Sequence, residues 1–132
     1  MKKIIILGAT GFIGKNIAIN FSKNKSYEVH AVRYTRPAYK TDDKIRWHKA
    51  DLRNPSEVNK LLKGMDIVIQ AAATTSGSKD IVSKPHIHVT DNAVMNSYIF
   101  RAAFEHNIKH LIFTSCTVMY PSSKKATSEK NF

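Results

Sequence analysis

Three glycines mark the part of this sequence where chemistry is first expected. Gly8, Gly11 and Gly14 follow the apolar run at 4–7 at intervals of three residues, and a helix-like stretch comes next. Glycine lets a strand-to-helix turn tighten and lets its backbone approach a pyrophosphate on the free N–H groups of the helix. The spacing therefore predicts a dinucleotide cradle, with the third glycine allowing close helix–strand packing. The alternative is a tight turn that binds no ligand. A P-loop is disfavoured, because no Lys-Ser or Lys-Thr pair ends the glycine segment.

Two arginines follow where a dinucleotide-binding chain distinguishes its cofactors. Arg33 closes the stretch YEVHAVR, about 20 residues past the glycines, and Arg36 lies in the loop after it. A carboxylate at this place binds the ribose 2′-hydroxyl of NAD(H), whereas arginine accommodates the 2′-phosphate of NADP(H). Because no acidic residue occurs in this loop before Asp42, we expect NADP(H) to be favoured over NAD(H). The alternative is that both arginines are ordinary solvated side chains.

Charge and histidine content bear on two other classes of function. Lys and Arg number 21 against 10 Asp and Glu, which gives a formal net charge of +11, but the basic residues are spread along the chain. We therefore expect no nucleic-acid partner, and a nucleic-acid binder that exploits this charge is the lowest-ranked alternative. No metal site is expected either, because no cysteine or acidic cluster accompanies the six histidines. These are His30, His48, His86, His88, His106 and His110.

The single cysteine and the lengths of the apolar runs indicate the compartment. Cys116 alone cannot form an internal disulfide, which fits a reducing environment. No apolar run approaches the roughly 20 residues that span a bilayer. The first run is short and followed at once by glycines, so it is interpreted as a strand rather than a signal peptide. We expect a cytoplasmic protein with no membrane partner.

The elements that must position these residues alternate along the chain. The predicted strands are 3–7, 27–33, 44–50, 66–72 and 110–115. The predicted helices are 12–24, 54–65 and 91–106. In the second helix, Asn54 is a capping residue, Pro55 lies in the first turn and Gly64 is the stop.

This order of elements predicts the fold class. It indicates an α/β protein with a Rossmann-type, doubly wound parallel sheet of about five strands in the order 3-2-1-4-5. Residues 34–43 are expected to cross between the second and third strands as a loop. We assign a dinucleotide-binding domain to residues 1–120 and a polar loop or tail to residues 121–132.

Five ordered motifs resemble the extended short-chain dehydrogenase/reductase family of nucleotide-sugar epimerases, dehydratases and reductases. They are GATGFIG at 8–14, ADLRN at 50–54, IQAAATTSG at 69–77, DNAVMNSYIFRAA at 91–103 and HLIFTSCTVMYPSS at 110–123. Gln70 stands where many members carry histidine. The resemblance implies that Asp51 and the backbone of Leu52 hold the adenine and that Asn92 supports the active site. It assigns further cofactor contacts to Gly8, Thr10, Gly11, Phe12, Ile13, Gly14, Ala71, Ala72 and Ala73.

The same resemblance implies hydride transfer between a nicotinamide and a sugar carbon, with a tyrosine as general acid/base beside a lysine. The family places a Ser or Thr four residues before the tyrosine of a strand-end motif. Here that tyrosine is Tyr120, which we expect to face substrate. Counting back gives Cys116, a thiol in place of the hydroxyl or else a small buried hydrophobe. Ser115 and Thr117 flank it, so these three residues are the catalytic candidates.

The Tyr-x-x-x-Lys pair of the family is not seen on a later helix. The one such spacing joins Tyr120 to Lys124 at the strand-end motif, where the lysine is interpreted as incidental. We therefore expect the 132 residues to be the cofactor-binding part of a longer enzyme, inactive by itself. The alternative is a non-catalytic NAD(P)-binding sensor or regulatory protein of the same fold. For the full-length protein we expect a nucleotide-sugar substrate and a possible homodimer.

Overall fold

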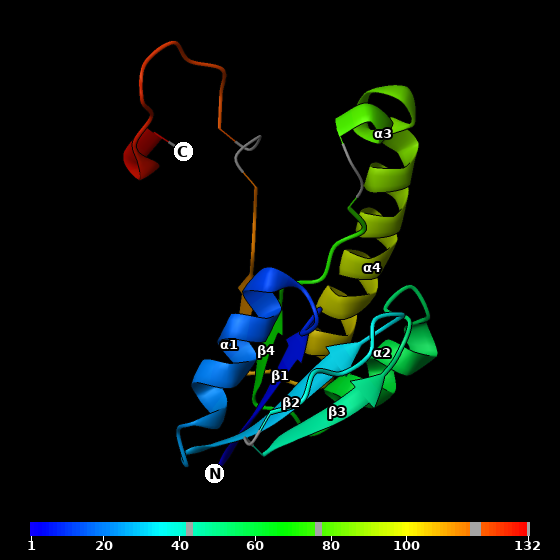
Figure 1. Ribbon diagram of the computed structural model, residues 1–132, viewed down its shortest axis with the longest axis vertical. Coiled ribbons are helices and arrows are strands. Elements are labelled where there is room, and N and C mark those ends of the chain that lie inside the picture. Colours follow the sequence, from blue (N-terminus) through cyan, green and yellow to red (C-terminus); the bar gives the residue numbers. More distant parts are fainter. Residues whose placement is uncertain (42–43, 76–77, 117–119, 132) are drawn as a thin grey trace.

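The computed structural model describes residues 1–41, 44–75, 78–116 and 120–131, and a parallel sheet forms its centre (Figure 1). The strand order is β3-β2-β1-β4-β5, and every neighbouring pair is parallel. The predicted fold class and strand order are therefore confirmed. The strands are β1 (Lys2–Leu7), β2 (Tyr27–Arg33), β3 (Ile45–Lys49), β4 (Ile67–Gln70) and β5 (His110–Phe113).

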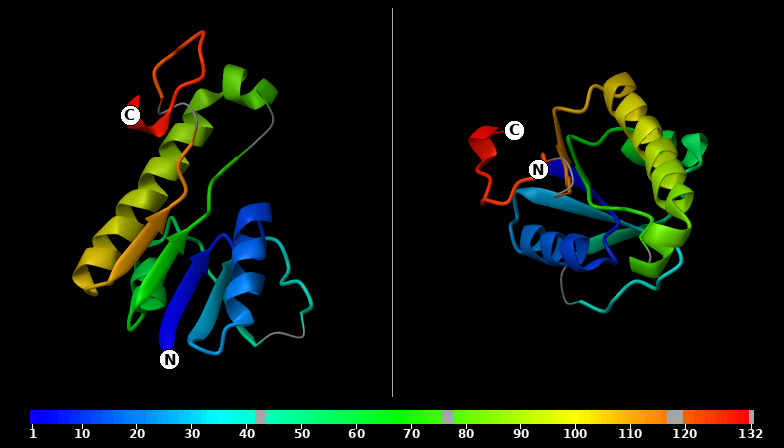
Figure 2. Two further views of the ribbon diagram at one scale, coloured as in Figure 1. Left: turned by 90° about the vertical axis from the view of Figure 1, so that its left-hand side faces the viewer. Right: turned by 90° about the horizontal axis from the view of Figure 1, so that it is seen from above.

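Helices cover both faces of this sheet. Figure 2 shows α1 (Phe12–Ser22) on one face, with α2 (Pro55–Leu62) and α4 (Pro85–Glu105) on the other. The short helix α3 (Ser78–Ser83) precedes α4, and the 3₁₀ turn η2 (Glu129–Asn131) lies in the predicted polar tail. None of the helices in the described ranges is long and apolar enough to cross a membrane.

Strand β1 supplies apolar side chains to both layers of the core. Ile4 and Ile6 pack in the α1 layer with Ala18, whereas Ile5 and Leu7 pack in the layer of α2 and α4. All four side chains of this run are fully buried. A central parallel strand is covered on both faces, so it reads as a continuous apolar run rather than an alternating one. This explains why the sequence IIIL precedes the glycines.

The helix after β4 differs from the prediction. It begins at Pro85 rather than at residue 91, and α3 was not predicted at all. The buried residues of α4 start only at Met95, because its first turns and α3 extend past the sheet (Figure 1). These turns therefore lack the apolar periodicity on which a helix prediction depends.

The predicted boundaries of α2 have a clear physical basis. The Asn54 side chain accepts hydrogen bonds from the backbone N–H groups of Ser56 and Glu57, at 3.0 and 3.3 Å. Gly64 follows the helix with φ of +75°. The cap and the stop are confirmed, although the helix itself covers Pro55–Leu62 rather than 54–65.

Two histidines on β2 and β3 hold each other within the sheet. His30 is 6% exposed; its Nδ1 lies 2.9 Å from Nε2 of His48, and its Nε2 lies 3.0 Å from Oε1 of Glu28. Burial, and then the positive charges of His30 and Arg46, lower the pKa of His48. Among the described residues, no group of three or more His, Cys, Asp or Glu side chains is placed to hold a metal ion.

Candidate functional site

A cleft of about 480 Å³ opens at the carboxyl edge of the sheet, where the chain after β1 turns to one face and the chain after β4 leads to the other. Open α/β sheets bind ligands at this change of direction. The volume lies within the range of about 300–1,000 Å³ that small-molecule sites occupy. Four loop segments and helix α4 line the cleft: the turn after β1, the segments that follow β2, β3 and β4, and the part of α4 that carries Asp91 and Met95.

The turn after β1 presents backbone rather than side chains. Gly8 adopts φ of +77°, and the Gly11 N–H donates to the Gly8 carbonyl at 3.0 Å. Gly11 is the N-cap of α1 and supplies no side-chain cap, and the first turn carries no acidic residue. The first N–H groups of a helix have no acceptor within the helix. Together with the helix dipole they favour an anion at this place.

Two of the glycines are required by close approach. A Cβ on Gly8 would lie 2.6 Å from the Cα of Ala72, in addition to the strain of its positive φ. A Cβ on Gly14 would overlap the Gly8 carbonyl oxygen and lie 2.9 Å from the Gly8 carbonyl carbon. Gly14 thus lets α1 sit directly against the turn, which is the packing position predicted for it.

The segment after β4 is fixed by two amide side chains. Gln70 is buried; its Nε2 donates to the Ala72 carbonyl at 3.1 Å and to Oδ1 of Asn96 at 2.8 Å. Asn92 accepts from the Thr74 N–H at 2.8 Å and donates to the Thr74 carbonyl at 3.0 Å. Both amides therefore hold the wall that faces Gly8, and Asn92 acts through Thr74.

Two arginines lie at the end of β2 and in the loop after it. Arg33 and Arg36 both line the cleft. Within the described part of the chain, neither side chain forms an ion pair or a side-chain hydrogen bond. Both arginines therefore line the cleft without a carboxylate partner among the described residues.

The loop after β3 contributes a charged network. Arg53 binds Asp51 through two hydrogen bonds, from Nε to Oδ1 at 3.0 Å and from Nη2 to Oδ2 at 2.8 Å. Hydrogen bonding by Arg53 is the main reason that the pKa of Asp51 falls from 3.8 to about 2. The Asp51 N–H donates to Oε2 of Glu57 at 2.7 Å, which ties the loop to the first turn of α2.

The structure brings most of the predicted cofactor residues together and leaves some apart. Phe12 and Ile13 are 87% and 53% exposed and do not line the cleft. Any cofactor contact from these two residues would therefore come from their backbone N–H groups in the first turn of α1. Gly14 is buried beneath the turn. The predicted residues that line the cleft are Gly8, Thr10, Gly11, Arg33, Arg36, Asp51, Leu52, Ala71, Ala72 and Ala73.

The catalytic and substrate candidates that the structure describes do not line this cleft. Ser115 and Cys116 follow β5 and are exposed, and Tyr120 lies farther along, 37% exposed. None of these three is among the residues that line the cleft. Thr117 lies outside the described residues. The alternative that Cys116 is a small buried hydrophobe is wrong, because its side chain is exposed.

Sequence reasoning missed part of the cleft lining. Arg53 stands inside the motif ADLRN and Asp91 opens the motif DNAVMN, yet neither was assigned a role. No spacing rule predicts a pair of residues 38 positions apart, such as Arg53 and Asp91. The other unpredicted lining residues are Val32, Tyr34, Thr35, Ala50, Thr74, Thr75 and Met95.

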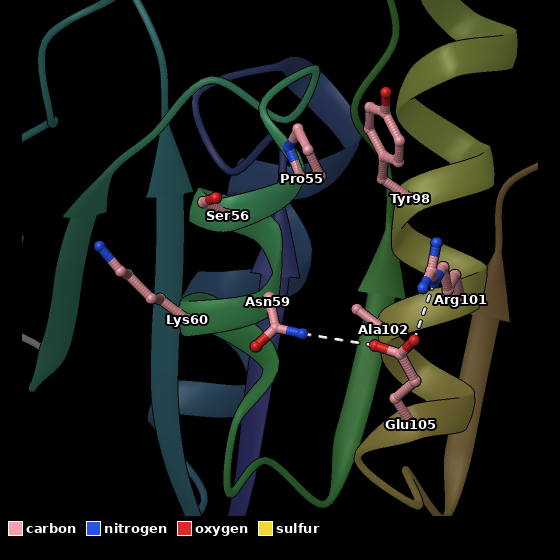
Figure 3. A pocket seen from close by; sticks show the side chains of 8 residues that line it. All are labelled: Pro55, Ser56, Asn59, Lys60, Tyr98, Arg101, Ala102 and Glu105. Atoms are coloured by element: carbon pink, nitrogen blue, oxygen red, sulfur yellow. Dashed lines mark hydrogen bonds and ion pairs between the residues drawn. The ribbon is translucent and has the colours of Figure 1, made fainter.

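A second cavity, of about 510 Å³, lies between α2 and α4 and contains none of the predicted site residues (Figure 3). Its single carboxylate is already bound: Nε of Arg101 donates to Glu105 at 2.8 Å, and the Asn59 amide donates to the same carboxylate at 3.4 Å. It is lined by Pro55, Ser56, Asn59, Lys60, Tyr98, Arg101, Ala102 and Glu105.

Comparison with known proteins gives consistent matches over most of the chain. The sequence profile described as "NAD dependent epimerase/dehydratase family" matches residues 4–132. GDP-L-colitose synthase of Yersinia pseudotuberculosis is 28% identical over 121 residues, which are 90% of this chain and 35% of that protein. UDP-glucose 4-epimerase of Lactobacillus helveticus is 26% identical over 126 residues, 93% of this chain and 38% of that protein.

A solved structure supports the fold independently. The UDP-glucose 4-epimerase of Bifidobacterium longum, in complex with NAD⁺ and UDP, superposes with a TM-score of 0.80 at 21% identity. The match covers 97% of this chain and 42% of that one. The chain therefore spans between about a third and two fifths of the length of the relatives that it matches.

Proposed function

Because this chain belongs to the NAD dependent epimerase/dehydratase family, we propose that its cleft binds NADP(H) in preference to NAD(H). We propose further that the whole protein acts on a nucleotide sugar by hydride transfer. The observation that carries the cofactor preference is the pair Arg33 and Arg36, at the end of β2 and in the loop after it. Both line the cleft without a carboxylate partner in the described residues.

The glycine turn fits the part that both cofactors share. A pyrophosphate needs a close backbone approach and N–H donors, and the Gly8–Gly11 turn with the uncapped start of α1 offers both. Asp51 and Leu52 line the same cleft in the loop after β3, where we assign the adenine. A bound nicotinamide would supply a hydride donor or acceptor, and the residues of this chain would position it.

The arginines fit the part that distinguishes the cofactors. A guanidinium offers a planar set of donors that matches phosphate oxygens. Arg33 ends β2, the strand next to β1, and Arg36 follows in the loop after it. Both line the cleft together with the turn proposed to hold the pyrophosphate. A carboxylate would repel a 2′-phosphate, and the carboxylates that line the cleft, Asp51 and Asp91, are bound to Arg53.

The activity of the whole protein rests on the relatives. Their names describe a GDP-sugar synthase and a UDP-sugar epimerase, and we propose a nucleotide sugar as substrate on that basis. Ser115, Cys116 and Thr117 remain the proposed catalytic candidates, with Tyr120 facing substrate. We expect the 132 residues to bind cofactor without turnover, and α4, with Phe104 86% exposed, to take part in a homodimer.

Thermal melting tests the cofactor proposal. At equal concentration, NADPH should raise the melting temperature more than NADH, because a ligand stabilises the folded state in proportion to the logarithm of its concentration over Kd. Equal shifts, or a larger shift with NADH, would refute the preference. If the full-length gene product binds cofactor but turns over no nucleotide sugar, the sensor alternative replaces the enzyme.

A further inference from the structure

Arg53 joins three segments around the cleft with a single side chain. Besides its two bonds to Asp51, its Nη1 donates to Oδ2 of Asp91 on α4 at 3.0 Å. Its Nη2 also donates to the Tyr34 hydroxyl at 3.2 Å, and its guanidinium carbon lies 5.6 Å from the centre of the Tyr34 ring. The side chain thereby links the loops after β2 and β3 to the helix after β4.

The charges in this network set the potential of the cleft. Asp51 and Asp91 are the two carboxylates among the residues that line it. Both carboxylates are bound to Arg53, whereas Arg33 and Arg36 have no such partner in the described part of the chain. If Arg53 were removed, two unpaired carboxylates would share the cleft with a dinucleotide that carries several negative charges.

The network also reaches the wall that contacts the glycine turn. Oδ2 of Asp91 accepts a hydrogen bond from the Thr74 hydroxyl at 3.5 Å. The neighbouring Asn92 holds the Thr74 backbone from both sides. Arg53 therefore acts on the position of the segment after β4 through Asp91, without belonging to that segment.

We propose that Arg53 is a positioning residue for the cofactor: it neutralises Asp51 and Asp91 and fixes the loops that carry them, so that the cleft accepts an anionic dinucleotide. The role rests on the proposed function, since it presupposes that the cleft binds a dinucleotide. In this role Arg53 stays with its carboxylates in the complex, and the ligand phosphates contact other donors.

Titration with NADPH tests this role in four proteins: the wild type, Arg53→Met, Asp91→Asn and the double variant. Arg53→Met should weaken binding about tenfold at roughly 50 mM salt, and the deficit should shrink at roughly 300 mM salt because the repulsion is screened. Asp91→Asn alone should tighten binding a few-fold. In the double variant it should restore part of the lost affinity, because Asp51 stays unpaired there.

Arg101→Met is the matched control. It removes the same charge from an exposed pair on α4, outside the cleft (Figure 3), and should leave the NADPH affinity unchanged. Melting temperatures establish that each variant is folded. If Arg53→Met does not fold, the expected gain in Asp91→Asn still decides the matter.

Three results would overturn the proposal. A double variant as weak as Arg53→Met would mean that the unpaired charge of Asp91 does not cause the loss of affinity. An Arg53→Met protein that binds like the wild type would remove the role while leaving the proposed function intact. A wild-type protein that binds neither NADPH nor NADH would instead refute the proposed function, and this role with it.

Discussion

The turn after β1 and the loop after β3 face the same cleft, but they shape it by different means. The turn at 8–11 acts through its backbone. Its close packing against neighbouring backbone is possible only because glycine has no Cβ atom. The loop at 50–53 acts through charged side chains, and Arg53 fixes it by pairing with two carboxylates. We infer that steric constraints decide whether the turn at 8–11 can form. Electrostatics set how strongly the loop at 50–53 attracts an anion.

The largest effect is expected from Gly8→Ala. The added Cβ meets the Ala72 backbone at 2.6 Å, and φ of +77° is strained for alanine. Strain and overpacking together should cost about 2–5 kcal/mol in the free energy of unfolding, measured by urea denaturation. Binding of NADPH and of NADH should be lost together, because the turn is assigned to the part that the two cofactors share.

Gly64→Ala is the control for this substitution. Gly64 has nearly the same φ, +75°, but a Cβ there would meet no atom within 4 Å. Its cost should be limited to backbone strain, about 1–2 kcal/mol. If Gly8→Ala cost no more than Gly64→Ala, close approach would not be what requires glycine in the turn.

The next largest effect is expected from Arg33→Met, which removes a contact proposed for NADP(H) but not for NAD(H). Arg33→Met should weaken NADPH binding about 10- to 100-fold, because a hydrogen bond to a charged group contributes about 1.5–3 kcal/mol. Affinity for NADH, measured in the same fluorescence titration, should change little. Equal losses for both cofactors would assign Arg33 to the shared part of the ligand instead.

The two regions also differ in how far the sequence predicts them. The glycine spacing predicts the turn because its cause is local: a strand, a tight bend and a helix within eleven residues. The strand order follows from the same local patterns. The pairing of Arg53 with Asp91 depends on how α4 lies against the loop after β3, and no pattern in the sequence records it. Helix α3 was missed for a related reason, since it extends past the core and carries no apolar periodicity.

A smaller effect separates the two regions by pH. Arg53 lowers the pKa of Asp51 to about 2, so this carboxylate stabilises the fold above its unfolded pKa of 3.8 and loses that contribution as the pH falls toward 2. Because both side chains are partly exposed, the contribution is about 1 kcal/mol. The stability gap between wild type and Arg53→Met should therefore narrow from about pH 5 to about pH 2.5, measured by urea denaturation.

Gly8→Ala is the control for this pH dependence. The gap between wild type and Gly8→Ala should not depend on the pairing of Asp51, because steric overlap is insensitive to protonation. A gap for Arg53→Met that stayed constant over this pH range would show that Arg53 stabilises the loop by packing rather than by its charge.

The most direct test of the proposed cofactor preference uses two fragments of the cofactor. Adenosine 5′-diphosphate and its 2′-phosphorylated form differ only in the group assigned to Arg33 and Arg36. Calorimetric titration of the wild-type protein should show both binding, with the 2′-phosphorylated form at least about tenfold tighter. Equal affinities, or tighter binding of the fragment without the 2′-phosphate, would contradict the account.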